Sequence, residues 1–192
     1  LAQALMLTEE MAPQVHDVAR EAREILGISE PVEIYQSGTL NRESFNAALV
    51  LTRGDVILLL LEGRLIAEFE QSELLNLMGH ELGHFLAHGA RWPFVMTAQA
   101  ATKIYMYAPG HRLEVMAAGI SRSRELTAER IGLLTCQDLD AVLRVSMLAA
   151  SGLAPSSISW EPKAYLDGCR RLMEEALESG ETALGGTHPE HN

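Results

Sequence analysis

The chain has 192 residues, of which 47% are apolar and 21% are charged, and this composition is typical of a globular protein rather than a disordered one. The length supports one sizeable hydrophobic core, so we expect a single domain over residues 1–192. Fifteen lysines and arginines stand against 26 aspartates and glutamates, which gives a net charge of −11. A surface this acidic repels phosphate backbones and anionic lipids, which excludes nucleic acid and the membrane surface as expected partners.

The sequence predicts no membrane span. Its longest uninterrupted apolar run, residues 56–61, is far shorter than the ~18 residues that a spanning helix needs. No signal peptide is recognisable, because Glu9 and Glu10 follow the apolar start and no basic segment precedes it. We expect the chain as given to be soluble. It begins at Leu1 and not at Met, so a signal or anchor upstream of Leu1 remains an alternative, and the compartment is not predicted.

The N-terminal third combines one helix with a small sheet. Apolar residues at helical spacing predict an amphipathic helix over residues 8–26 with Gly27 as its stop, which makes residues 1–30 a helical segment. Residues 31–61 change to short runs with strand character. We expect strands at 32–35, 45–51 and 56–60, with a turn at Arg53-Gly54-Asp55 between the last two.

Residues 72–179 have helical periodicity. Ser72 is the expected N-cap of a helix that ends at His88, ahead of Gly89. Further helices are expected at 94–107, at 113–134, at 138–151 with Asp138 as N-cap, and at 162–178 beginning with Pro162. Residues 180–192 form a tail. Because strands come first and helices follow, the expected fold class is α+β, mainly helical, with a small N-terminal sheet.

Residues 72–179 contain a motif that indicates a specific chemistry. His80-Glu81-Leu82-Gly83-His84 reads H-E-x-x-H inside the helix expected from Ser72. Residues four apart project from one face of a helix, so the imidazoles of His80 and His84 can reach one zinc ion. Glu81 follows the first ligand, where a carboxylate can accept a proton from a zinc-activated water. The alternative is a helix with two ordinary histidines.

A catalytic zinc needs a third protein ligand and an open fourth position. One class of zinc hydrolase has a third His six residues after the second, but this chain has Ala90 there, which excludes that class. An acidic ligand from a later helix is the other option, and Glu114, Glu125 and Glu129 are the candidates. Glu125 and Glu129 share a helix face, so one can bind the metal while the other orients a ligating imidazole.

Residues 121–130 read Ser-Arg-Ser-Arg-Glu-Leu-Thr-Ala-Glu-Arg. This segment resembles the S-R-x-R-E-x-x-A-D signature of HtpX-like zinc metallopeptidases, the gluzincin family that also contains the CAAX prenyl proteases. The resemblance implies a zincin-like domain in which Glu125 is the third zinc ligand. It also implies that the carboxylate four residues on orients a ligand. The family has Asp at that position, whereas this chain has Glu129.

Weaker similarities extend the resemblance over about residues 32–189. Asn46-Ala47 resembles the family's N-A segment, and we expect this edge strand to hold an extended substrate through main-chain hydrogen bonds. Thr187-His188-Pro189 resembles the family's T-H-P motif, so His188 is a candidate donor to the oxyanion of peptide hydrolysis. The family's transmembrane helices have no counterpart in this sequence.

The sequence therefore predicts a zinc-dependent metalloendopeptidase that acts on peptide or protein substrates. His80, His84 and Glu125 are expected to hold Zn²⁺, and Glu81 is expected to act as general base. The alternative is a non-catalytic module, peptide-binding or chaperone-like, that retains the metallopeptidase fold. The substrate and the oligomeric state are not predicted.

Overall fold

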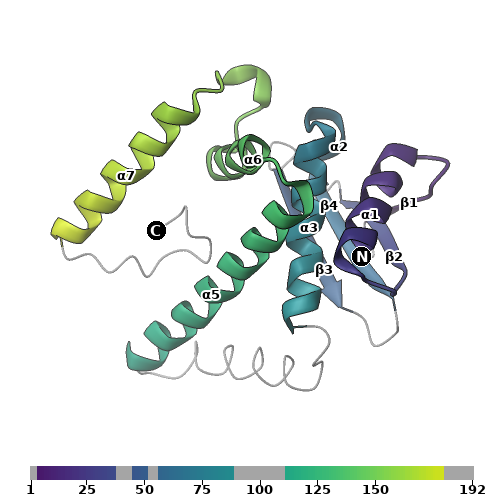
Figure 1. Cartoon of the computed structure of the whole chain (residues 1–192), viewed down its shortest axis with the longest axis horizontal. Coiled ribbons are helices and arrows are strands. Elements are labelled where there is room, and N and C mark those ends of the chain that lie inside the picture. Colours follow the sequence, from purple (N-terminus) through teal and green to yellow (C-terminus); the bar gives the residue numbers. More distant parts are fainter. Residues whose placement is uncertain (1–3, 38–44, 52–55, 89–110, 180–192) are drawn as a thin grey trace.

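A computed structural model gives the fold and describes residues 4–37, 45–51, 56–88 and 111–179. The strands are β1 (Ala4–Leu7), β2 (Val32–Ser37), β3 (Phe45–Leu51) and β4 (Ile57–Gly63). The helices are α1 (Pro13–Leu26), α2 (Leu65–Glu68), α3 (Gln71–His88), α5 (His111–Cys136), α6 (Leu139–Ser151) and α7 (Pro162–Ser179), with a short 3-10 helix η2 (Pro155–Ser157). This mixture, strands early and helices late, confirms the α+β class (Figure 1).

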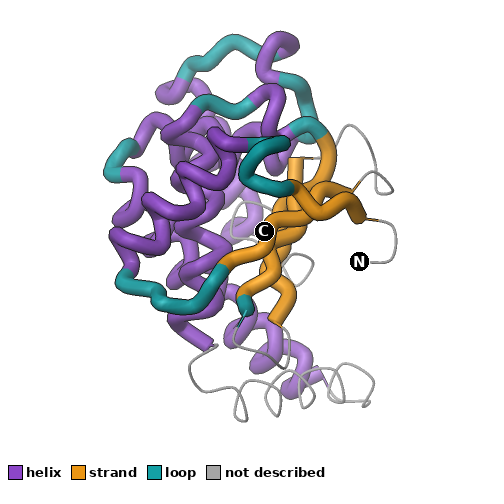
Figure 2. Tube along the Cα trace, turned by 90° about the vertical axis from the view of Figure 1, so that its right-hand side faces the viewer, coloured by secondary structure: helices purple, strands orange, loops and turns teal. Residues whose placement is uncertain are grey.

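The strands form one sheet in the order β1-β2-β4-β3. β2 and β4 run parallel, while β1 and β3 are antiparallel to their neighbours. Figure 2 shows this sheet on one side of the molecule, with the helices gathered against it. Among the described strands β3 is the last in the sheet, and its edge away from β4, the free edge, pairs with no described strand. That edge lies next to α3, which is the helix that carries the H-E-x-x-H motif.

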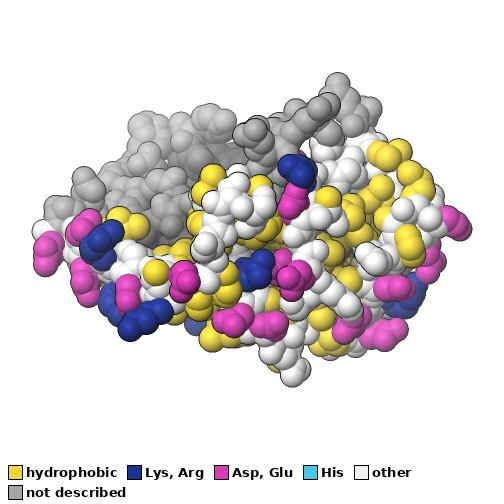
Figure 3. All heavy atoms as spheres, turned by 90° about the horizontal axis from the view of Figure 1, so that it is seen from above, with side chains coloured by type: hydrophobic (Ala, Val, Ile, Leu, Met, Phe, Trp, Pro, Cys, Tyr) yellow, Lys and Arg dark blue, Asp and Glu magenta, His cyan; other side chains and the backbone are white. Residues whose placement is uncertain are grey.

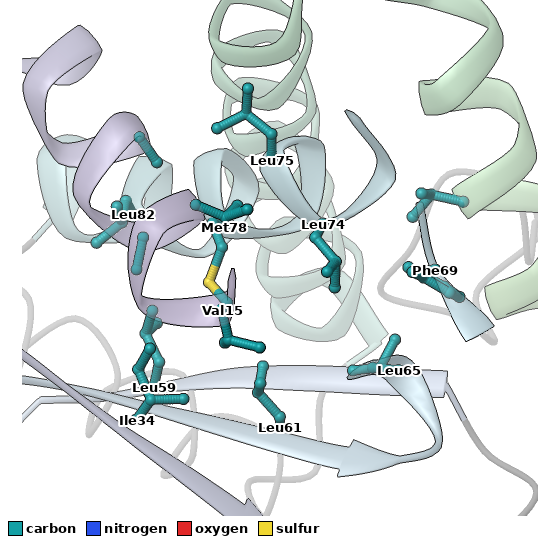
Figure 4. Close-up of a cluster of buried hydrophobic side chains, with 14 of the residues drawn as sticks. Val15, Ile34, Leu59, Leu61, Leu65, Phe69, Leu74, Leu75, Met78 and Leu82 are labelled. Atoms are coloured by element: carbon teal, nitrogen blue, oxygen red, sulfur yellow. The ribbon is translucent and has the colours of Figure 1, made fainter. Parts of the chain in front are cut away.

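The main hydrophobic core lies between the sheet and the helices α1 and α3 (Figure 4). The sheet and both helices contribute fully buried apolar side chains, among them Val15, Ile34, Leu59, Leu61, Met78 and Leu82. Each such side chain contributes about 1.5–3 kcal/mol by leaving water. This core fixes α3 against the sheet, so the motif helix has a defined position relative to β3.

The N-terminal part departs from the expected boundaries. α1 begins at Pro13 and not at residue 8, because the carbonyl of Thr8 first accepts turn hydrogen bonds from Met11 and Ala12. A proline at the first helical position suits this start. The expected stop at Gly27 is confirmed, since Gly27 has a φ of 65° in the left-handed region. β1, α2 and η2 were not predicted from the sequence.

The start of α3 corrects the prediction that Ser72 is its N-cap. The helix begins at Gln71, and the N–H of Glu70 donates to Glu73 Oε2 at 2.8 Å, which is one half of a capping box. Glu73 Oε1 also lies 2.8 Å from Arg144 Nε of α6. The buried Glu73 side chain therefore fixes the N-terminus of α3 and ties it to α6. The expected end at His88 is confirmed.

The later elements follow the sequence more closely. α5 is two residues longer at each end than expected, and the Asp138 carboxylate caps α6 by accepting the N–H of Ala141 at 3.1 Å. α7 begins at Pro162 as predicted. β3 has the predicted bounds, whereas β2 and β4 extend to Ser37 and Gly63.

Two predicted elements lie outside the described residues, namely the helix at 94–107 and the turn at Arg53-Gly54-Asp55. Within the described part of the chain, no helix combines the length and the apolar character that crossing a membrane requires. The division of residues 1–192 as a single domain stays a prediction.

Candidate metal centre

Three side chains of the motif lie on adjoining parts of α3. His80 and Glu81 are buried, and His84 is partly buried one turn further along the helix. The rings of His80 and His84 meet edge to face, with centroids 4.8 Å apart. Their Nε2 atoms are 3.2 Å apart. The helix therefore directs two imidazole nitrogens at a common point, as the four-residue spacing predicts.

Glu125 of α5 adds an oxygen to this pair. Its Oε2 atom lies 3.5 Å from His80 Nε2 and 3.5 Å from His84 Nε2. His80, His84 and Glu125 thus form a group that could hold a metal ion. The structure brings together the three residues that were predicted as ligands. Two of them, His84 and Glu125, lie on different helices and are 41 positions apart in the sequence.

The triangle of ligand atoms has a size that suits zinc. Zinc takes nitrogen and oxygen ligands at about 2.0–2.2 Å, and tetrahedral coordination then places neighbouring ligand atoms about 3.3 Å apart. The observed separations are 3.2, 3.5 and 3.5 Å. Two imidazoles and one carboxylate are also a donor set typical of catalytic zinc, and they leave one coordination position for water or substrate. The residues present therefore fit the ion.

Glu129 lies one turn beyond Glu125 on α5, on the other side of His80. Its Oε1 atom is 3.3 Å from His80 Nδ1. A carboxylate there accepts the Nδ1–H of a neutral imidazole, which leaves the lone pair of Nε2 directed at the metal position. The longer glutamate side chain thus reaches the position at which the resembling family has Asp. Its role as an orienting carboxylate stays a prediction.

The carboxylates around His80 change its protonation. Burial on its own lowers the pKa of His80, but hydrogen bonds to Glu125 and Glu129 and the nearby charge of Glu81 outweigh it and raise that pKa to about 10. The group is therefore a buried concentration of negative charge that favours a cation. A metal ion meets the same demand as the proton, so the two compete for the imidazole.

Glu81 lies between the candidate metal ligands and the edge of the sheet. Burial raises the pKa of its carboxyl, while the charges of His80 and His84 and the N–H of Leu49 act in the opposite direction, and burial prevails. The Leu49 N–H donates to Glu81 Oε2 at 2.8 Å. The sequence does not reveal this contact, because a main-chain donor leaves no side-chain signature.

The same hydrogen bond shows which residues of β3 direct their main-chain groups away from β4. Leu49 is paired with Leu59 of β4, but its N–H points to the opposite edge of the strand, towards α3. In such a ladder the main-chain groups of alternate residues face opposite edges, so those of Ala47 share the free edge with Leu49. The main-chain groups of Asn46, which is opposite Glu62, then face β4. Of the two residues predicted at the substrate edge, Ala47 is the one on the free edge.

Three glycines allow α3 and α5 to approach closely. A Cβ atom at Gly79 would lie 2.5 Å from Thr135 Oγ1 and one at Gly83 would lie 3.2 Å from the Ala128 Cα atom. A Cβ at Gly132 would lie 2.8 Å from Asn76 Nδ2. The helix backbones are therefore nearly in contact beside His80, which lets the short carboxylate arms of α5 reach the imidazoles. The role of these glycines was not predicted from the sequence, although the Gly79-x-x-x-Gly83 spacing is a signal for close helix packing.

His188 belongs to residues 180–192, which lie outside the described part of the chain. Its predicted contribution to the oxyanion stays a prediction.

Comparison with known proteins gives two positive results. The sequence model of peptidase family M48 matches residues 9–192. The chain is also similar to a plastoglobule-localized metallopeptidase 48, chloroplastic, from Arabidopsis thaliana, with 27% identity over 171 residues. That alignment covers 87% of this chain and 48% of the relative, so the chain spans about half the length of the curated protein that it matches.

No solved structure gave a significant match. The family match extends over nearly the whole chain and includes both helices of the candidate metal centre. It confirms the metallopeptidase resemblance seen in the sequence. The chain belongs to peptidase family M48.

Proposed function

We propose that this chain is a zinc-dependent endopeptidase with a zincin-like active site. The observation that carries the proposal is the convergence of His80 Nε2, His84 Nε2 and Glu125 Oε2 at 3.2–3.5 Å, with the buried Glu81 carboxylate on the next residue of the same helix. Family membership supports a metallopeptidase, and the size and chemistry of the donor set support zinc.

The residues have distinct roles in this proposal. Bound zinc supplies a Lewis acid that polarises the scissile carbonyl and acidifies water. The Glu81 carboxylate accepts a proton from the attacking water while the water oxygen adds to the carbonyl carbon. It then delivers that proton to the amine nitrogen as the C–N bond breaks. Burial favours the protonated carboxyl that must persist between these two steps.

The substrate is proposed to be an extended peptide on the free edge of β3. Main-chain hydrogen bonds to such an edge ignore side-chain identity and suit a peptidase that acts on varied sequences. The Asn46-Ala47 segment supplies this edge, and the main-chain N–H and C=O of Ala47 face it. His188 is proposed as an additional donor to the developing oxyanion.

A non-catalytic module that holds peptides is the second candidate. The free edge of β3 supports it, because β-strand addition alone can bind a peptide. The buried Glu81 counts against it. A carboxylate kept beside the ligand group has a desolvation cost, and a module that only binds peptides has no use for it.

The two candidates are separated by Glu81→Gln. The amide keeps the shape of the side chain but cannot accept the proton, so turnover of an unstructured protein substrate is expected to fall about 10²–10⁴-fold while zinc content stays unchanged. Glu174→Gln on α7 is the matched control and is expected to retain full activity. Near-normal cleavage by Glu81→Gln would contradict the role of Glu81. Binding of peptides without any cleavage that a chelator blocks and zinc restores would favour the second candidate.

A further inference from the structure

A hydrogen bond links the edge of the sheet to the helix that carries the H-E-x-x-H motif. Glu81 is 6% exposed, and its Oε2 accepts the Leu49 N–H at 2.8 Å. We propose that the main-chain N–H of Leu49 is a positioning group for Glu81: it holds Oε2 and leaves Oε1 as the oxygen that exchanges the proton. This inference rests on the proposed function of Glu81 as general base.

Strand pairing and core packing together fix the position of the donor. β3 is held by its ladder with β4, in which Leu49 lies opposite Leu59. Leu49 itself packs against the main core, which also contains Leu82 of α3. The donor and the acceptor therefore belong to two elements fixed by the same core. A hydrogen bond from a main-chain N–H to a carboxylate is about twice as strong as one between neutral groups, so it restrains the terminal torsion of Glu81.

Holding one oxygen gives the two carboxylate oxygens different tasks. A free carboxylate rotates and presents either oxygen in many directions, whereas a general base must place one lone pair within about 2.6–3.2 Å of the proton that it takes. With Oε2 bound to Leu49, the remaining lone pairs of Oε1 have a fixed direction. The sheet edge thus contributes to the rate of the chemical step and not only to substrate binding.

The same contact limits how a peptide can pair with β3. Ala47 and Leu49 both direct their main-chain groups to the free edge of β3, but the Leu49 N–H already donates to Glu81. A peptide therefore pairs with the N–H and C=O of Ala47 and with the C=O of Leu49. This arrangement assigns the two residues separate functions: Ala47 binds the substrate, and the N–H of Leu49 orients the base.

Amide hydrogen exchange tests the contact without any need for activity. In the full chain, with and without zinc, we expect the Leu49 amide to exchange at least about tenfold more slowly than the Ala47 amide on the same edge. Glu81→Gln keeps an acceptor oxygen and is expected to retain this protection. Glu81→Ala is expected to lose it at Leu49 alone. Exchange at Leu49 as fast as at Ala47 in the wild-type chain would overturn the proposal.

Kinetics test the assigned roles. Leu49→Pro removes the N–H at an outward-facing edge position, where proline does not break the ladder. We expect kcat to fall about 10–100-fold with KM within about threefold and zinc content unchanged, while the distant control Glu174→Gln on α7 retains wild-type kcat. Ala47→Pro is the matched control and is expected to raise KM with little change in kcat. An increase in KM alone for Leu49→Pro would show that this N–H binds substrate, and would overturn the proposal.

Two further readouts keep the outcomes separate. Circular dichroism and thermal unfolding report whether Leu49→Pro folds, and if it does not, the exchange experiment on Glu81→Ala still decides the question. If the wild-type chain shows the expected exchange pattern but no chelator-sensitive cleavage, the contact exists and the proposed function fails. If cleavage is present and Leu49 is unprotected, the proposed function stands and the positioning role fails.

Discussion

The α3–α5 pair and α7 differ sharply in how they meet the rest of the molecule. α3 and α5 approach until a single methyl group at Gly79 or Gly132 would collide with the partner helix. α7 projects from the described body (Figure 1) and exposes apolar side chains, with Leu172 at 62% and Leu177 at 80% of their full surface. α3 and α7 each have 18 residues, yet α3 carries two residues of the candidate centre and α7 carries none of them.

The contrast shows that precision at the centre comes from packing and not from helix length. A zinc site would require ligand atoms on two helices to meet within about 0.5 Å of the coordination geometry. The close approach of the backbones at the glycines holds the two helices at the separation that brings these atoms together. α7 contributes none of the three residues of the candidate group. Figure 3 shows acidic, basic and apolar side chains mixed over the described part of the face seen from above.

The largest expected difference between the two regions concerns zinc. A ligand that binds only the folded state stabilises it by about 4 kcal/mol at a thousandfold excess over its Kd. Zinc is therefore expected to raise the thermal midpoint of the wild-type chain by several degrees, and Glu125→Ala is expected to abolish most of that rise. Calorimetry with elemental analysis measures both. Glu174→Gln on α7 should behave as wild type, and an unchanged zinc content in Glu125→Ala would mean that another residue is the third ligand.

Ion pairs provide the next comparison. Glu73 of α3 is buried and lies 2.8 Å from Arg144, whereas Glu175 of α7 is exposed and lies 3.9 Å from Arg171. Glu73→Ala is expected to lower the free energy of unfolding by about 3 kcal/mol, because it also leaves the Glu70 N–H without its acceptor. Glu175→Ala is expected to change it by less than about 0.5 kcal/mol. Denaturant unfolding of both variants checks this, and equal losses would show that α7 is as firmly packed as α3.

Most of the long helices and the two histidines of the candidate metal centre could be predicted because their signals are local. The H-E-x-x-H spacing places His80 and His84 on one face whatever the fold, and Asp138 and Pro162 mark helix starts through groups that act within one turn. The third ligand required more than spacing. Glu125 and Glu129 were equivalent until a resemblance distinguished them, and the structure shows Glu125 Oε2 facing both Nε2 atoms while Glu129 faces Nδ1.

The unpredicted features depend on contacts between distant segments. The Leu49 N–H is a group that every residue except proline has, so nothing in the sequence marks it as the donor to Glu81. β1 was not predicted because its four residues are too few for an alternation of apolar and polar side chains to be recognised. Its partner β2 also lies some 30 positions later in the sequence. The N-cap of α3 was misplaced because the side chain that bonds its first turn is Glu73, a residue three positions inside, and not Ser72.

The same substitution, Gly to Ala, is expected to lower the free energy of unfolding in α3 and to raise it in α7. Gly79→Ala on α3 adds a methyl group 2.5–2.6 Å from the Thr135 Oγ1 and Cβ atoms, and Thr135 cannot rotate away without breaking its 2.7 Å hydrogen bond to the Ile131 carbonyl. We expect this variant to lose about 1–2 kcal/mol of stability after the gain in helix propensity is counted. Separation of the helices should also weaken zinc binding about tenfold or more.

Gly168→Ala is the same change in the middle of α7, where an added Cβ meets nothing within 4 Å. Here the helix propensity acts without a steric penalty, so the free energy of unfolding is expected to rise by up to about 1 kcal/mol, with zinc affinity unchanged. Parallel denaturant unfolding and zinc titration of the two variants measure both effects. If Gly79→Ala were as stable and bound zinc as tightly as Gly168→Ala, α5 would have room to move, and the close approach of the backbones would not be what fixes Glu125 beside the two histidines.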